Sequence, residues 1–121
     1  MSEQQAVFEK AMALIDAANS QDPNKVTVDG KEWPKELLYS MRMSDMLQRF
    51  APQADHAVQL AIRAQLVERW KSPRDAYPMD RFGYLQWRKD LYKIQAGTAA
   101  GLMQQAGCNE ADIDRVRTAV A

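Results

Sequence analysis

Helix-capping and helix-terminating residues divide this chain of 121 residues into five stretches with helical periodicity. In each stretch apolar side chains recur three and four residues apart, and no stretch sustains the alternation that is typical of a β-strand. We therefore predict an all-α fold, a single-domain bundle of about five helices that spans residues 1–121. The predicted helices cover residues 3–19, 34–50, 54–71, 81–106 and 110–120.

Residues with strong positional preferences mark the helix ends. Ser2 opens the first helix as a capping box with Gln5, in which each side chain satisfies a free backbone N–H. Pro34 suits the first turn of the second helix, because its missing N–H costs nothing there. The other markers are Pro52 after the second helix, Asp80 and Asn109 as N-caps, and Gly107 as a left-handed residue after the fourth helix.

Finer expectations follow from the same patterns. Residues 26–28 (Val-Thr-Val) form either a short extended piece or half of a hairpin. Gly97 and Gly101 are expected where a neighbouring helix approaches the fourth helix closely. The predicted core stripes are Leu37, Leu38, Met41, Leu47 and Phe50, then Val58, Ile62, Leu66 and Trp70, then Trp87, Leu91, Ile94, Thr98 and Gly101, and finally Ile113, Val116 and Val120.

Composition excludes several classes of protein. Hydrophobic residues make up 46% and charged residues 26%, which is typical of a globular domain and too apolar for intrinsic disorder. Sixteen basic residues balance sixteen acidic ones, so we expect no nucleic-acid partner. The single cysteine excludes an internal disulfide, and no apolar run is long enough for a membrane span. Residues 1–5 do not resemble a signal peptide, so we expect a cytoplasmic protein with no membrane partner.

The charge balance conceals a basic, aromatic segment. Residues 63–93 hold eight basic and four acidic residues, a net charge of +4, together with six of the ten aromatic residues. Arginine pairs with phosphate or carboxylate through two parallel hydrogen bonds, and aromatic rings stack on planar ligands. This composition leaves two interpretations open: a ligand pocket, or aromatic rings in the core with arginines that pair with Asp75, Asp80 and Asp90.

Other candidate residues point to no specific chemistry. His56 is the only histidine and is interpreted as a solvated surface residue at a helix start. Cys108 has no obvious base nearby and is interpreted as a passive thiol. Because no phosphate-binding loop, dinucleotide fingerprint or cluster of histidine and cysteine ligands is present, we predict no cofactor and no metal.

A succession of short motifs resembles the bacterial and fungal domain-of-unknown-function family 4202. The motifs are residues 28–40 (VDGKEWPKELLYS), Arg63-Ala64-Gln65, Glu68-Arg69-Trp70, Pro73-Arg74, Tyr77-Pro78 and residues 83–88 (GYLQWR). The resemblance covers nearly the whole chain and implies a helical fold, without an established activity. It also implies a shortened scaffold, since family members continue beyond the position of Ala121.

This sequence departs from the family pattern at three positions. Leu66 and Gln95 stand where the family has histidine, and Met41 stands where it has a polar residue. A leucine can neither ligate a metal nor move a proton. The resemblance therefore implies that the family's own chemistry is lost, through divergence or through engineering.

The leading hypothesis is a small helical binding domain with a basic, aromatic pocket for a small anionic or planar ligand between the second, third and fourth helices. The expected ligand-binding residues are Met41, Leu66, Arg69, Trp70, Arg74, Tyr77, Arg81, Tyr84, Trp87, Arg88 and Gln95. One alternative is an enzyme that uses the same pocket: either a hydrolase that cleaves phosphoesters with a metal held by carboxylates, or a redesigned enzyme with a single base such as Glu68 or His56. Another is a structural or interaction module that forms a homodimer to cover an apolar helix face.

Overall fold

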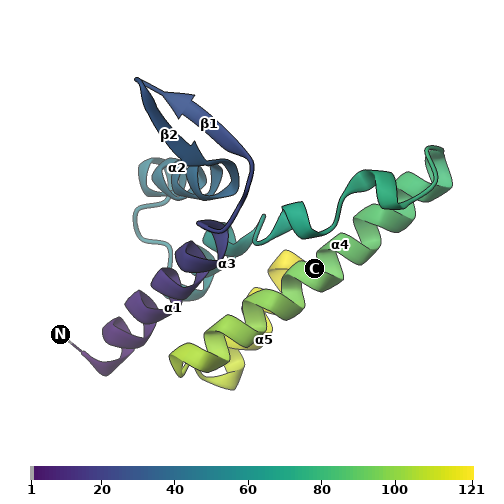
Figure 1. The fold of residues 1–121 in the computed structure, drawn as a ribbon. Helices are drawn as coiled ribbons and strands as arrows, with labels where there is room; N and C mark the ends of the chain where they lie inside the picture. The colour runs from purple at the N-terminus through teal and green to yellow at the C-terminus, as the bar shows by residue number, and fades with distance from the viewer. Residues whose placement is uncertain (1) are drawn as a thin grey trace.

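The computed structural model describes residues 2–121, and these residues are predominantly helical, as predicted. Figure 1 shows the elements, which in chain order are α1 (Glu3–Asn19), β1 (Lys25–Val28), β2 (Lys31–Pro34), α2 (Lys35–Phe50), α3 (His56–Ala64), the 3₁₀ turns Arg69–Lys71 and Arg74–Ala76, α4 (Arg81–Ala106) and α5 (Glu110–Val120). The predicted N-caps are confirmed: the side chains of Ser2, Asp80 and Asn109 each accept a hydrogen bond from a backbone N–H of the helix that follows. Gly107 has the left-handed backbone expected after α4, with φ of 91°.

The extended piece at residues 26–28 is half of a hairpin. Strand β1 pairs with β2 in an antiparallel register that sets Val28 opposite Lys31. The two turn residues, Asp29 and Gly30, both have positive φ, 51° and 77°. Such a pair of left-handed residues makes the two-residue turn that suits the twist of a hairpin, and it directs the chain back into α2.

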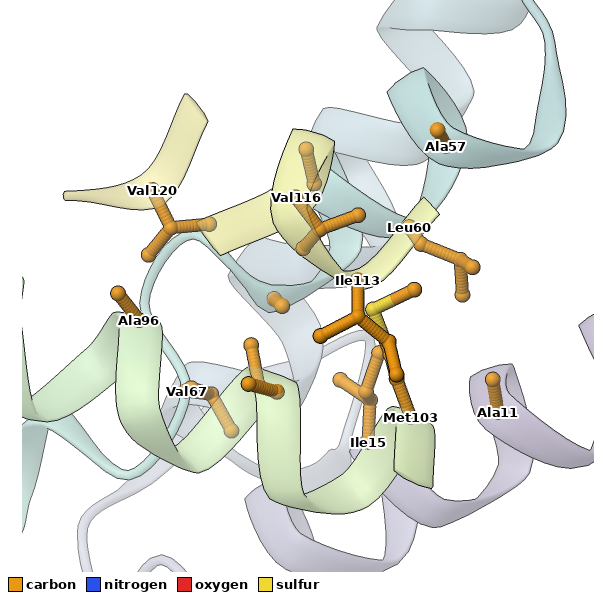
Figure 2. Packing of buried hydrophobic residues seen from close by; sticks show 14 of the residues in the cluster. Ala11, Ile15, Ala57, Leu60, Val67, Ala96, Met103, Ile113, Val116 and Val120 are labelled. Carbon is orange, nitrogen blue, oxygen red and sulfur yellow. The ribbon is translucent and has the colours of Figure 1, made fainter. Parts of the chain in front are cut away.

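The core lies between α1, α3, α4 and α5, and Figure 2 shows its side chains converging from these four helices. Eight of its fifteen residues are alanine, and small side chains let helix backbones approach closely. Ile15, Met103 and Ile113 are fully buried and fill the centre. The predicted inner face of α5, which is Ile113, Val116 and Val120, is confirmed.

The predicted third helix is wrong in length and in its buried face. Helix α3 ends at Ala64, a turn follows, and the 3₁₀ turn Arg69–Lys71 takes the place of the last predicted helical residues. The alanine side of α3 faces the core, whereas Val58 is exposed. The prediction placed the bulky side of α3, with Val58 and Ile62, in the core. The helices pack so closely here that small side chains face the core instead.

Some predicted core positions on α2 and α4 are also wrong. Phe50 is 83% exposed and Ile94 is 51% exposed. Gly97 and Gly101 have open space where a β-carbon would be, so no helix approaches them closely. The close approach instead occurs at Gly83, where a β-carbon would collide with the backbone carbonyl of Pro78.

The long helix α4 extends beyond the core. It has 26 residues and is therefore about 39 Å long. Its C-terminal half packs on α1 and α5, while Figure 1 shows its N-terminal half projecting away, on the side opposite the N-terminus of α1. Within residues 2–121, no helix combines the length and apolar character needed to cross a bilayer.

Candidate functional site

The predicted ligand-binding residues fall on three parts of the fold: α2, the irregular segment 65–80, and α4. In chain order they are Met41 on α2; Leu66, Arg69, Trp70, Arg74 and Tyr77 in the segment 65–80; and Arg81, Tyr84, Trp87, Arg88 and Gln95 on α4. Gln95 is buried, Arg81, Tyr84 and Arg88 are exposed, and the others are half-buried. Their contacts divide these residues into two groups.

Two aromatic side chains fasten the segment 65–80 to the first half of α4. The indole Nε1 of Trp87 donates a hydrogen bond of 2.8 Å to the carbonyl oxygen of Ser72. The hydroxyl of Tyr77 donates one of 2.8 Å to Oδ2 of Asp90. This bond raises the pKa of Tyr77 and lowers the pKa of Asp90, because it favours the neutral phenol and the charged carboxylate. Both rings are half-buried and hold the backbone of this segment in place, outside the hydrophobic core.

Arg74 is also engaged by the backbone. Its guanidinium donates to the carbonyl oxygens of Tyr77, Pro78 and Asp80, at 3.3, 2.9 and 3.3 Å. The same group lies 5.8 Å from the ring centre of Tyr84. Arg74 therefore closes the turn that leads into α4, and its donors are already directed at carbonyls of the protein.

The two arginines on α4 face outward. Arg88 donates to the hydroxyl of Tyr92 and lies between the rings of Tyr84 and Tyr92, 5.7 and 5.4 Å from their centres. Arg81 makes no side-chain hydrogen bond or ion pair among residues 2–121. Both side chains are exposed, so they are not enclosed in the expected pocket between the second, third and fourth helices.

Arg69 belongs to a different group, which we call the junction cluster: Asn19, Asp22, Glu36, Glu68 and Arg69. It lies where the end of α1, the start of α2 and the turn after α3 meet. Nε of Arg69 donates to Oε1 of Glu36 at 3.2 Å. Asp22 accepts from the backbone N–H of Glu36 at 2.9 Å, and Asn19 accepts from that of Glu68 at 3.1 Å. The cluster therefore joins segments that are far apart in the sequence.

The junction cluster contains two buried polar atoms without partners. Among residues 2–121, Nδ2 of Asn19 and Oε2 of Glu36 are buried and make no hydrogen bond. The same holds for two atoms outside the cluster, Oγ of Ser44 on α2 and Nε2 of Gln95 on α4. Such groups are rare in folded proteins and are costly when they stay unpaired. Burial raises the pKa of the Glu36 carboxyl, against the opposing effect of the Arg69 charge.

The backbone at this place is strained as well. Glu68 has a left-handed conformation with φ of 54°, which is uncommon for a residue with a side chain. The hydrogen bond from its N–H to Asn19 holds it there. Strain of this kind concentrates at functional sites, where surrounding contacts enforce it.

Sequence reasoning singled out Arg69 and Glu68 but missed Asn19, Asp22 and Glu36. Glu36 was recognised only as part of a family motif, and Asn19 and Asp22 were not singled out as site residues. The available signal was weak: Glu36 lies one turn before Ser40, on the side of α2 that is buried together with Leu38. A charged residue on a buried helix face is the kind of exception that indicates a site.

A groove of about 840 Å³ lies elsewhere, where the N-terminal ends of α1, α3 and α5 meet. The rings of Phe8 and His56 stack there, with centres 4.1 Å apart and planes inclined by 17°. His56 is thus half-buried against a ring, which differs from the expected solvated histidine. Burial raises the pKa of the Cys108 thiol in the same groove, in accord with a passive thiol.

A smaller cavity of about 260 Å³ lies beside α3 and α5. Neither this cavity nor the groove is lined by any of the eleven predicted ligand-binding residues.

Across residues 2–121, no three histidine, cysteine or acidic side chains gather closely enough to hold a metal ion. The chain matches no curated protein and no solved structure in the comparisons made. A family model does match, over residues 9–121, and its description is "Domain of unknown function (DUF4202)". Because this match covers nearly the whole chain and agrees with the helical fold, the chain belongs to the DUF4202 family.

Proposed function

We propose that this chain is a small helical binding domain that holds a small ligand with an anionic group at the junction cluster. Arg69 supplies the positive charge, and the unpartnered Nδ2 donor of Asn19 supplies a hydrogen bond to an acceptor. Trp70, next to Arg69, offers an aromatic face to a planar part of the ligand.

The observation that carries the proposal is the combination of an accessible guanidinium with buried, unpartnered polar atoms. The side chain of Arg69 is 36% exposed, while that of its partner Glu36 is 5% exposed. Glu36 takes up the Nε donor, so the guanidinium edge with the two terminal nitrogens has no hydrogen-bond partner among residues 2–121. A carboxylate or phosphate pairs with such an edge through two parallel bonds. The buried Nδ2 donor of Asn19 favours a ligand with a hydrogen-bond acceptor, because this donor gains a partner on binding.

A thermal-shift panel of nucleotides, sugar phosphates and aromatic carboxylates tests the proposal. Ligand at about 100 times its Kd stabilises the folded state by about 2.7 kcal/mol. For a domain of this size that corresponds to a rise in Tm of roughly 10 °C. We expect at least one anionic compound to produce a concentration-dependent rise, and we expect its uncharged analogue to produce none.

Two variants locate the site. Arg69→Gln, combined with Glu36→Gln so that no carboxylate is left unpaired, is expected to abolish the shift. Arg81→Gln removes an equally cationic but fully exposed side chain and is the matched control, expected to retain the shift. A panel without any shift on the unmodified protein refutes the proposal, and so does a shift that the double variant keeps.

A further inference from the structure

The two ends of α4 present complementary surfaces. At its start, three large apolar side chains are exposed: Met79 by 78%, Phe82 by 85% and Leu85 by 48%. Arg81 and Lys89 share the helix face of Leu85, four residues to either side, and both are exposed. We call these five residues the α4 tip. An exposed apolar group that is flanked by cations on a projecting helix is typical of a docking surface.

The other end of α4 contributes to the groove described above, because Gly107 is among its lining residues. Val7, Phe8 and Leu60 make the groove partly apolar, and acidic residues surround them. Arg115, a basic residue of the groove, pairs with Asp55 at 2.9 Å. The other two acidic residues, Glu3 and Asp112, make no ion pair among residues 2–121. The two unpaired carboxylate charges exceed the half-charges of the three helix N-termini that meet here, so the rim keeps a small net negative charge.

We propose that the α4 tip of one molecule docks into this groove on a second molecule, so that copies of the chain associate head to tail. The cationic tip matches the acidic rim, and the apolar side chains match the apolar floor. The two surfaces lie about 39 Å apart along α4, so they cannot meet within one copy. A contact between two different surfaces leaves each copy with a free tip and a free groove, and it therefore propagates into rings or chains.

Sedimentation equilibrium from micromolar to millimolar concentration tests this inference with three variants. Phe82→Asp disables the tip. Gln4→Lys with Gln53→Lys disables the groove by placing two cations on its rim, at exposed positions that make no side-chain hydrogen bond to another residue among 2–121. Phe50→Asp is the matched control, because Phe50 is as exposed as Phe82 but belongs to neither surface. Circular dichroism checks that each variant is folded.

We expect the mean mass of the unmodified protein and of Phe50→Asp to rise with concentration, and to fall back as salt screens the charges. We expect the tip variant alone and the groove variant alone to stay monomeric. A mixture of these two is expected to form one-to-one dimers, since one supplies an intact groove and the other an intact tip. A monomeric unmodified protein overturns the inference. If the tip variant or the groove variant associates with itself, the contact is symmetric or uses a different surface, and the inference is overturned. A mixture of the two variants that stays monomeric overturns it as well.

Discussion

Asp22 acts as an N-cap for a helix that begins thirteen residues later, and its removal tests the architecture of the junction cluster. The residue before α2, Pro34, offers no side-chain cap. Asp22 fills this function: Oδ2 accepts from the backbone N–H of Glu36 at 2.9 Å, while Oδ1 accepts from that of Asn24 at 2.9 Å. With 1% exposure, the Asp22 carboxylate leaves no room for water to replace it at these donors. The variant to make is Asp22→Ala.

The magnitude follows from these bonds. Loss of an N-cap costs about 1 kcal/mol, and leaving the buried N–H of Glu36 without a partner costs about 1–3 kcal/mol. These contributions overlap, so we expect Asp22→Ala to lower the free energy of unfolding by about 2–3 kcal/mol. Urea denaturation followed by circular dichroism measures this difference at constant pH. Because Asp22 positions the residue that holds Arg69, the same variant is expected to weaken binding of any anion found in the thermal-shift panel.

Asp45→Ala is the matched control for this prediction. Asp45 is an exposed aspartate on the same helix and makes no side-chain hydrogen bond among residues 2–121. We expect it to change the free energy of unfolding by no more than about 0.5 kcal/mol. If Asp22→Ala were as stable as Asp45→Ala, the Asp22 carboxylate would not be capping α2, and our account of the junction cluster would be refuted.

The effects of four further substitutions are predicted from burial and backbone contacts. Gly83→Ala is expected to destabilise the protein by about 1–3 kcal/mol, because the added β-carbon would collide with the carbonyl of Pro78. Gly97→Ala is expected to stabilise the protein by about 1 kcal/mol, because alanine favours a helix and the space beside Gly97 is open. Equal melting temperatures of the two variants would contradict both predictions. Glu36→Gln removes a carboxyl whose pKa is raised by burial. We therefore expect the unmodified protein to lose stability relative to this variant as the pH rises through the folded-state pKa of Glu36. Urea denaturation at a series of pH values from acid to neutral measures this difference, and an equal pH dependence of the two proteins would contradict the prediction. Ile113→Ala creates a cavity in the centre of the core, with an expected loss of about 2–5 kcal/mol in urea denaturation, and a loss below 1 kcal/mol would place Ile113 outside the core.

The features that were predictable from the sequence are local ones. Asp80, Asn109 and Gly107 act on backbone groups within a few residues of themselves, so their helix ends could be recognised without knowing the fold. The apolar face of α5 was also recognisable from the sequence, because a short helix that packs on one core has a single stripe of apolar residues. The family motifs likewise directed attention to Arg69 and Gln95.

The candidate site was decided by tertiary contacts. Arg69 and its partner Glu36 are 33 residues apart, and Glu68 has its left-handed backbone where its N–H donates a hydrogen bond to Oδ1 of Asn19, 49 positions earlier. Neither residue type carries a local preference for these arrangements. Alanine packing determined which side of α3 is buried, and the projection of α4 beyond the core left Phe82 exposed. The sequence alone determined where most of the helices begin and end, because caps act over one turn. Only the tertiary structure decided which polar groups are buried together, because that depends on segments brought together by the core.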